Sequence, residues 1–278
     1  MTAAEPPIPP VAAGHDLVTI DTTQAHTARV YDFLLGGTDN FAVDREVASY
    51  AFSAYPNGLD GVRADARANR AFLTRTVRYL VGEAGIRQLL DIGSGIPSAG
   101  NTHEVARALD EGTRVVYVDN DPIVLAHAHT LLDGAPDGTT AFVPGDVEQP
   151  DAVLDVASRT LDLDQPVGLV LVGLLHVVPD AHVHVQRLVD ALAPGSYLVI
   201  SHMCAVTEDG TDLGEVGRRL DERMHASNPP ALRSRDDVAR FFTGLELVPP
   251  GLVPVAAWRP DDEAVRPVAL IGGVARKP

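Results

Sequence analysis

Short apolar runs alternate with helical patterns over the second part of the chain. From Gly85 onward the apolar runs cover residues 88–92, 114–118, 140–144, 168–173 and 196–202, and stretches with helical periodicity separate them. This alternation is typical of parallel strands joined by crossover helices. Further on, residues 245–248, 253–258 and 268–275 predict a late strand, a strand set apart by a loop and a closing antiparallel strand. The pattern therefore predicts an α/β fold with a doubly wound, mostly parallel sheet and an antiparallel C-terminal strand.

A purely helical pattern precedes this alternation. It predicts helices over residues 28–35, 43–54 and 64–81. The first helix should end at Gly36-Gly37, which suit a left-handed C-cap, and the third has an apolar stripe opposite several arginines. We therefore expect three units: a flexible tail at residues 1–24, an N-terminal helical cap at 25–82 and a core at 83–278.

Four helices of the second part have recognisable starts. Asn101-Thr102-His103-Glu104 resembles a capping box, and Asp121-Pro122 offers a cap followed by a proline at the first helical position. Asp180 is expected to cap a helix over residues 181–193, and Ser234 is expected to open a helix that continues to residue 242.

The charge balance of the chain excludes some partners. The 278 residues include 22 Lys+Arg and 38 Asp+Glu, which gives a formal charge of −16 at pH 7. Nucleic-acid binding depends on clustered basic residues, so we expect no nucleic-acid partner. The longest apolar run, residues 167–178, is shorter than the roughly 20 residues that cross a bilayer, so we expect no membrane partner.

Cysteine and lysine each occur once, which limits the cellular compartment and the type of reaction to be expected. The single cysteine, Cys204, cannot form an internal disulfide, and the N-terminal residues form neither a basic nor an apolar signal segment, so we expect a cytoplasmic protein. The only lysine is Lys277. Schiff-base chemistry and P-loop phosphate binding both need an internal lysine and are therefore excluded. The sequence carries no signal for the oligomeric state.

Acidic residues follow three successive predicted strands. Asp91 begins the segment Asp91-Ile92-Gly93-Ser94-Gly95, whose glycines let the backbone turn tightly and approach a ligand. Asp119 ends the next strand, and Asp146 follows the strand after that. Because the carboxyl ends of parallel strands meet at one edge of a sheet, we expect the three carboxylates at one crevice. There Asp119 is suited to accept two hydrogen bonds from the vicinal hydroxyls of a ribose.

This arrangement separates two nucleoside cofactors. A dinucleotide site follows the pattern G-x-G-x-x-G, but the third position here is Ser98, and additional acids would repel a diphosphate. S-adenosylmethionine carries no phosphate and presents an ammonium, a ribose and a sulfonium, all of which are compatible with carboxylates. The sequence therefore favours S-adenosylmethionine over NAD.

The chain resembles the class I S-adenosylmethionine-dependent methyltransferases, and more narrowly an actinobacterial S-adenosyl methyltransferase family. The resemblance extends from about residue 25 to the C-terminus. It rests on four groups of residues: Arg29-Val30-Tyr31-Asp32-Phe33-Leu34-Leu35-Gly36-Gly37-Thr38-Asp39-Asn40-Phe41, Asn69-Arg70-Ala71-Phe72-Leu73, Asp91 to Gly95 with Asn101-Thr102-His103-Glu104-Val105, and Leu174-Leu175-His176-Val177-Val178-Pro179-Asp180. It implies a Rossmann-like sheet, an N-terminal helical lid and S-adenosyl-L-methionine as the cofactor.

The resemblance also implies a role for each matching residue. The implied cofactor-binding residues lie in the lid, the glycine-rich segment and the ends of four strands: Tyr31, Gly36, Gly37, Asn40, Arg70, Asp91, Gly93, Gly95, Asp119, Asn120, Asp146, Val147 and Leu174. Of these, Arg70 is expected at the methionine carboxylate, Asp119 at the ribose, and Asp146 with Val147 at the adenine. The candidate catalytic residue is His176, near the methyl acceptor, because an imidazole can take a proton at neutral pH.

Some of these residues have a purely structural alternative. Asp146 could instead cap the next helix, and Gly36-Gly37 could simply end a helix. His176 could be a buried core residue. The pairs His127/His129 and His182/His184 have an i, i+2 spacing, which points their rings apart on a helix, so we expect no metal.

We expect an enzyme that transfers the methyl group of S-adenosylmethionine to a small-molecule acceptor. Because the sulfonium is already an activated donor, holding donor and acceptor in line supplies most of the acceleration. The alternative is a sensor or assembly protein that binds S-adenosylmethionine without turnover, since its pocket acids would be the same. A nicotinamide-dependent oxidoreductase is a third possibility, and Ser98 counts against it.

Overall fold

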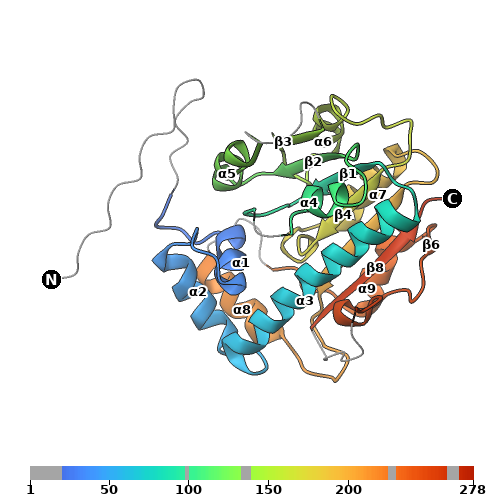
Figure 1. Cartoon of the computed structure of the whole chain (residues 1–278). Helices are drawn as coiled ribbons and strands as arrows, with labels where there is room; N and C mark the ends of the chain where they lie inside the picture. The colour runs from blue at the N-terminus through green and yellow to red at the C-terminus, as the bar shows by residue number, and fades with distance from the viewer. Residues whose placement is uncertain (1–20, 98–99, 133–138, 225–229, 262–268) are drawn as a thin grey trace.

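The strands of the protein form one sheet (Figure 1). A computed structural model describes residues 21–97, 100–132, 139–224, 230–261 and 269–278, with the backbone alone for 128–132. Within these residues the sheet has eight strands in the order β3-β2-β1-β4-β5-β8-β6, and β7 pairs with β8. The strands are β1 Gln88–Ile92, β2 Arg114–Asp119, β3 Thr140–Pro144, β4 Gly168–Val172, β5 Tyr197–Met203, β6 Glu246–Leu247, β7 Val253–Pro254 and β8 Leu270–Arg276.

The first five strands are parallel, and β8 lies antiparallel beside β5. The strand order reverses between β1 and β4, which is the point where open α/β sheets bind their ligands. The predicted α/β fold, with a doubly wound, mostly parallel sheet and an antiparallel C-terminal strand, is confirmed.

Helices cover both faces of the sheet. They are α1 Thr27–Leu35, α2 Ala42–Phe52, α3 Gly58–Arg78, α4 Thr102–Arg107, α5 Pro122–Leu132, α6 Pro150–Ala157, α7 Ala181–Ala191, α8 Gly214–Met224 and α9 Arg235–Ala239. Shorter helical turns are η1 Tyr79–Glu83, η2 Leu175–Val177, η3 Arg240–Phe242 and η4 Val255–Ala257. In Figure 1, α3 runs across the front of the sheet.

The alternation of side chains along each strand divides the apolar core into two layers. Leu89 packs in the same cluster as Phe72 and Val77 of α3, whereas its neighbour Leu90 packs with Val185 of α7 and Val153 of α6. Both faces of β1 are buried, so its apolar run is unbroken. The continuous run identified this strand in the sequence for that reason.

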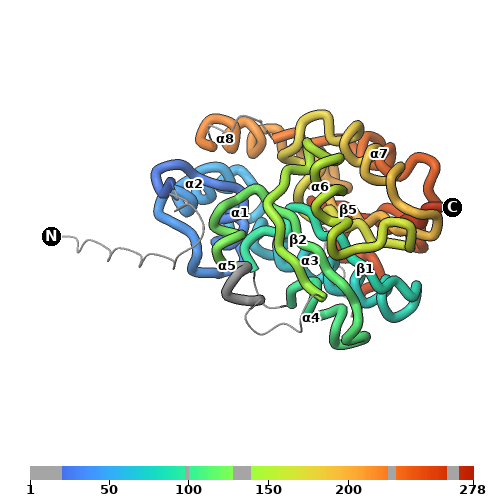
Figure 2. The backbone as a smooth tube through the Cα atoms, turned by 90° about the horizontal axis from the view of Figure 1, so that it is seen from above, coloured from blue at the N-terminus to red at the C-terminus, as the bar shows by residue number. Residues whose placement is uncertain are grey.

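The N-terminal helices gather at one end of the molecule. Figure 2 shows α1 and α2 together with α8, which comes from much later in the chain. Val216 of α8 and Val47 of α2 belong to the same apolar cluster, and the guanidinium of Arg223 lies 4.7 Å from the ring centre of Tyr50. The backbone N–H of Ala269 donates to Asp65 of α3 at 2.8 Å, just before β8 begins. The helical layer is therefore held by both ends of the chain.

Three of the four expected helix starts are confirmed. Asn101 forms a capping box with Glu104, the N–H of Ile123 donates to Asp121, and the Ser234 hydroxyl accepts from a backbone N–H of α9. The prediction for Asp180 is wrong in its mechanism: α7 begins after it, but its φ of 47° is left-handed and its side chain makes no capping bond. The side chain of a residue in that conformation does not reach the N–H groups that an N-cap normally satisfies.

The expected strand at residues 253–258 is much shorter than predicted. Only Val253–Pro254 pairs with β8, and the chain then turns into η4. Arg75 of α3 explains the turn, because its guanidinium donates to the carbonyls of Val255 at 2.7 Å and Trp258 at 2.8 Å. Those carbonyls are then unavailable to a sheet ladder. Arg75 is one of the arginines opposite the apolar stripe of that helix, and its side chain points toward η4.

Two further observations concern the predicted surroundings of the fold. No helix in the described ranges is long and apolar enough to span a bilayer. Residues 1–20 of the expected tail, residue Ser98 and the side chain of His129 lie outside the described part of the chain.

Candidate active site

The glycine-rich loop turns at the carboxyl end of β1. Gly93 and Gly95 have φ values of 71° and 67°, which favour glycine. The N–H of Gly93 donates to the carbonyl of Val118 at 2.8 Å, and the N–H of Gly95 donates to Asp119 at 2.8 Å. The loop therefore folds over the end of β2.

Asp119 holds this loop together with the start of α5. One carboxylate oxygen accepts from Gly95, and the other accepts from the N–H of Asp121 at 2.9 Å. A carboxylate offers about four lone-pair directions, so two remain for a ligand. Burial raises the pKa of Asp119, and the two backbone hydrogen bonds oppose that rise. The carboxylate lies where the sequence predicts, at the end of β2.

Asp91 lies two residues further from the carboxyl edge of the sheet than Asp119 does. It pairs in register with Tyr117, two residues before Asp119 on β2, so the two carboxylates share a face of the sheet but not a level. The Thr102 hydroxyl donates to Asp91 at 2.6 Å. Burial raises the pKa of Asp91 to about 6, while this hydrogen bond and the charge of Arg70 lower it.

Arg70 reaches the same place from α3. Its guanidinium donates to Asn101 at 3.0 Å, and its Nε is buried without a hydrogen-bond partner. The hydroxyl of Ser94 is also buried and unpaired. Both residues line one small cavity together with Asp91 and Gly95. The cavity thus joins a cation, an anion and two polar atoms with unused hydrogen-bonding capacity.

Asp146 and Asn120 form a pair at the outer part of this edge. The amide of Asn120 donates to Asp146 at 3.1 Å, and the N–H of Glu148 donates to its other oxygen at 2.9 Å. The N-cap position of α6 is Gln149, so the alternative in which Asp146 caps that helix is wrong. Val147 is buried in the apolar core, so only its backbone remains available to a ligand.

The cap motif is held together by the buried carboxylate of Asp32, whose role the sequence did not predict. Asp32 accepts from the N–H of Asp39 at 3.0 Å and from the Asn40 amide at 2.8 Å. A Cβ on Gly37 would lie 1.9 Å from that carboxylate, so only glycine leaves it room. Gly36 ends α1 in the left-handed conformation, as expected. Binding of the cofactor by Gly36, Gly37 and Asn40 stays a prediction.

The cap closes over the glycine-rich loop. Ala28 and Phe41 of the cap pack against Ile96 of the loop and Ile123 of α5, and Figure 2 shows α1 beside α5. His26 adds a polar contact, with its Nδ1 2.8 Å from Asp121. A ligand at the end of β2 would therefore lie next to the cap.

Tyr31 faces α3. Its hydroxyl donates to the carbonyl of Ala66 at 3.2 Å and accepts from the Asn69 amide at 3.1 Å. Burial raises the pKa of Tyr31, so it stays protonated. Asn69 appears in the family motif but was not among the predicted site residues. Its neighbours could not be inferred without knowing where α3 crosses the sheet.

Leu174 and His176 follow β4 on the other side of the glycine-rich loop. A Cβ on Gly93 would lie 2.7 Å from a methyl of Leu174, so the Leu174 side chain covers that glycine. His176 lies in η2, and its ring centre is 5.9 Å from that of His202. Its Nδ1 is buried without a partner. Burial, with a smaller effect from Arg233, lowers the pKa of His176 to about 4, so the ring is neutral at pH 7.

The other histidines make separate contacts. His127 lies 3.7 Å from Asp39, and His182 stacks on Phe241 with ring centres 3.9 Å apart. Within the described ranges, no group of three or more His, Cys, Asp or Glu side chains is arranged to hold a metal ion.

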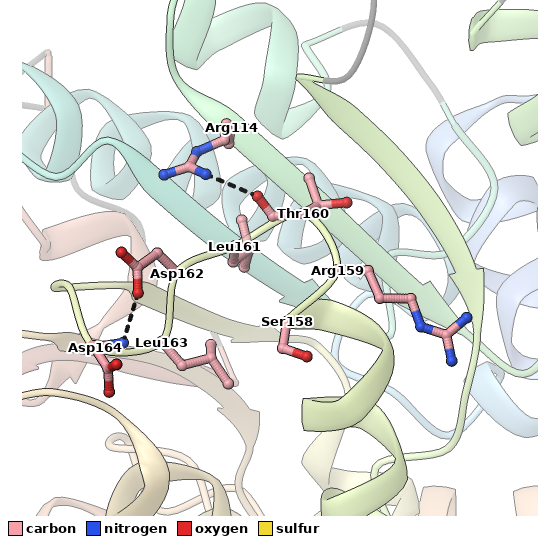
Figure 3. A pocket seen from close by; sticks show the side chains of 8 residues that line it. All are labelled: Arg114, Ser158, Arg159, Thr160, Leu161, Asp162, Leu163 and Asp164. Atoms are coloured by element: carbon pink, nitrogen blue, oxygen red, sulfur yellow. Dashed lines mark hydrogen bonds between the residues drawn. The ribbon is translucent and has the colours of Figure 1, made fainter.

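A wider hollow lies away from these residues (Figure 3). It has a volume of about 500 Å³ and is lined by Arg114 and residues 158–164. Arg114 begins β2, whereas Asp119 ends it, so the hollow belongs to the opposite edge of the sheet. It contains none of the predicted site residues.

The pKa of Asp91 predicts a pH dependence for any cationic ligand of the cavity. The pKa of Asp91 is raised from 3.8 to about 6. The unliganded protein therefore loses stability as the pH rises from about 4 to 6, because Asp91 then ionises in a buried place. A cation needs the ionised form, so its affinity should rise over the same window and level off above pH 7. We expect binding of S-adenosylmethionine to be about tenfold weaker at pH 5 than at pH 7 by calorimetry. Asp91→Asn should remove most of that difference. If the affinity of this variant depended on pH as that of the native protein does, Asp91 would not be the group that titrates.

Comparison with known proteins covers the whole of the cap and sheet. The chain matches the S-adenosyl methyltransferase family over residues 14–278. Its structure is similar to that of a DUF574 family protein from Streptomyces avermitilis, with 41% identity, a TM-score of 0.85 and coverage of 93% of this chain and 99% of that one. It is also similar to a proposed methyltransferase from Thermobifida fusca, with 40% identity, a TM-score of 0.83 and coverage of 92% and 96%. No curated protein matches the sequence.

Proposed function

The chain belongs to the S-adenosyl methyltransferase family, and we propose that it transfers the methyl group of S-adenosylmethionine to a small-molecule acceptor. The observation that carries this proposal is the Asp119 carboxylate at the end of β2, one strand from the switch point, which accepts from the N–H of Gly95 and has hydrogen-bonding capacity left over. That is the geometry a ribose diol requires at the end of β2.

The residues around the cavity fit the amino-acid end of this cofactor. Arg70 has an unpaired buried Nε suited to a carboxylate, and Asp91 beside it is suited to an ammonium. The Asp91 carboxylate beside the glycine-rich loop disfavours the diphosphate of a dinucleotide. When bound, S-adenosylmethionine supplies an activated methyl group on its sulfonium.

The protein then contributes by holding the cofactor and the acceptor in place and by enclosing them. The cap packs on Ile96 and α5, and so shields the methionine end from water. Leu174 covers Gly93 and separates the cofactor loop from the turn that carries His176. In this arrangement the acceptor binds beyond Leu174, in line with the transferred group.

His176 is our candidate for the proton acceptor when the methyl acceptor is a hydroxyl. Its unpaired buried Nδ1 supports this role, although burial lowers the pKa of His176 to about 4 and makes the ring a weaker base than a free imidazole. The formal charge of −16 supports a small molecule rather than a nucleic acid as the acceptor. We also place the reaction in the cytoplasm, because the single cysteine, Cys204, is free and buried.

Two measurements test the proposal. Calorimetry should show binding of S-adenosylmethionine and no binding of NAD, and a screen of small nucleophiles should then release S-adenosylhomocysteine with at least one of them. Binding without release across hydroxyl, amine, thiol and carbon nucleophiles would favour the alternative, a sensor or assembly protein. Affinity for NAD instead would overturn the proposal in favour of an oxidoreductase.

A further inference from the structure

Asn69 lies where three parts of the molecule meet. It is on α3, 1% exposed, and its amide nitrogen donates to the Tyr31 hydroxyl of α1. A Cβ on Gly173, in the turn after β4, would lie 3.0 Å from the same nitrogen. The next residue of that turn is Leu174, which covers Gly93. Asn69 therefore joins the cap to the side of the glycine-rich loop that faces β4.

The hydrogen-bond chain fixes which way the Asn69 amide points. Tyr31 uses its only proton on the carbonyl of Ala66, at 3.2 Å, so it must accept from Asn69. The group that faces Tyr31 is therefore the NH₂, and the opposite group is the carbonyl oxygen Oδ1. Tyr31 thereby acts as a positioning residue for that oxygen.

Oδ1 of Asn69 has no hydrogen-bond donor among the described residues, although it is buried. Buried polar atoms are nearly always paired, and an unpaired one calls for an explanation. Arg70, the next residue of α3, lines the cavity that also contains Asp91, and its Nε is unpaired as well. Successive residues of a helix point about 100° apart, so Arg70 faces this cavity while Asn69 lies against Gly173 in the turn after β4, at the strand-order switch point.

We propose that Asn69 Oδ1 accepts a hydrogen bond from the α-ammonium of the cofactor's methionine moiety while Arg70 meets its carboxylate. An amide oxygen accepts but cannot donate, so it distinguishes an ammonium from a carboxylate at this position. This inference rests on the proposed function, since it assigns a residue to the same cofactor.

The test compares two ligands that differ at this end. S-adenosylhomocysteine has the complete amino-acid group, whereas 5′-methylthioadenosine keeps the nucleoside and lacks the ammonium and the carboxylate. With the full chain, Asn69→Ala should weaken S-adenosylhomocysteine on the order of tenfold or more by calorimetry, since hydrogen bonds to charged groups are among the stronger ones. Its affinity for 5′-methylthioadenosine should change less than about twofold, by the same reasoning.

Further variants separate binding from general damage to the fold. Asn69→Asp should keep S-adenosylhomocysteine affinity above that of the alanine variant, because a carboxylate also accepts from an ammonium. Tyr31→Phe should weaken S-adenosylhomocysteine alone, since only the orientation of the amide is lost. Thr76→Val, at a buried position two turns along the same helix, should leave both affinities unchanged.

An equal loss for both ligands in Asn69→Ala would overturn the inference, because Asn69 would then only support the fold. No loss for either ligand would also overturn it. If Asn69→Ala does not fold, the aspartate and Tyr31→Phe variants decide by the same comparison. Failure of the native protein to bind either ligand would instead refute the proposed function, so the two failures are distinguishable.

Discussion

Asp119→Ala is expected to weaken binding of S-adenosylmethionine about 100-fold. The substitution removes the carboxylate that, in our proposal, accepts two hydrogen bonds from the ribose, and it also releases the N–H groups of Gly95 and Asp121. Charge-assisted hydrogen bonds contribute roughly 1.5–3 kcal/mol each, so losing two corresponds to about 3 kcal/mol or more. Calorimetric titration of the variant with S-adenosylmethionine measures the effect directly.

Two controls accompany this experiment. Asp119→Asn keeps an oxygen for Gly95 but loses the charge, so its affinity should fall between those of the native protein and the alanine variant. Asp155→Ala, at an exposed position of α6, removes the same charge from the chain and should bind as the native protein does. Undiminished affinity in a folded Asp119→Ala variant would refute the ribose assignment.

Gly37→Ala is expected to destabilise the cap by about 3 kcal/mol. The new Cβ would lie 1.9 Å from an oxygen of Asp32, so the carboxylate must leave its place. That movement breaks its hydrogen bonds to Asp39 and Asn40, both of which involve a charged partner. The temperature of thermal unfolding and the affinity for S-adenosylmethionine should both decrease, because the cap covers the glycine-rich loop.

A double-mutant cycle tests the proposed cause. If the Asp32 carboxylate is the obstacle, Gly37→Ala should cost little in an Asp32→Ala background. Gly82→Ala is a matched control, since its Cβ would meet only a methyl of Leu109 at an ordinary 3.7 Å. Additive losses in the cycle would show that another contact is responsible.

The strands of the core were predictable because burial on both faces leaves a continuous apolar run. Residues 88–92 were predicted to the residue for that reason, residues 140–144 were predicted to the residue although β3 is a half-buried edge strand, and the family resemblance is confirmed. Helix α8 was not predicted. Its side chains are mostly charged, and its apolar stripe is limited to Val216, Leu220 and Met224, while arginines supply its contacts with Tyr50.

The sequence predicts which edge of the sheet carries the candidate site, but not the relative levels of its residues or their neighbours. The end of each strand places Asp91 and Asp119 at one edge, but their difference in level follows from the register of β1 on β2, which no local pattern contains. The role of Asp32 depends on how its loop folds back. The neighbours of His176 come from β5 and from Arg233, far along the chain.

Leu174 lies directly on Gly93, with no room for even a methyl group between them. Whatever displaces the turn after β4 therefore also reshapes the loop at the end of β1, and the reverse holds equally. In our proposal donor and acceptor bind on either side of this contact, so binding of one should change the dissociation constant of the other by a factor common to both. Equilibrium binding of the donor in the presence of the acceptor, and of the acceptor in the presence of the donor, should accordingly show the same factor.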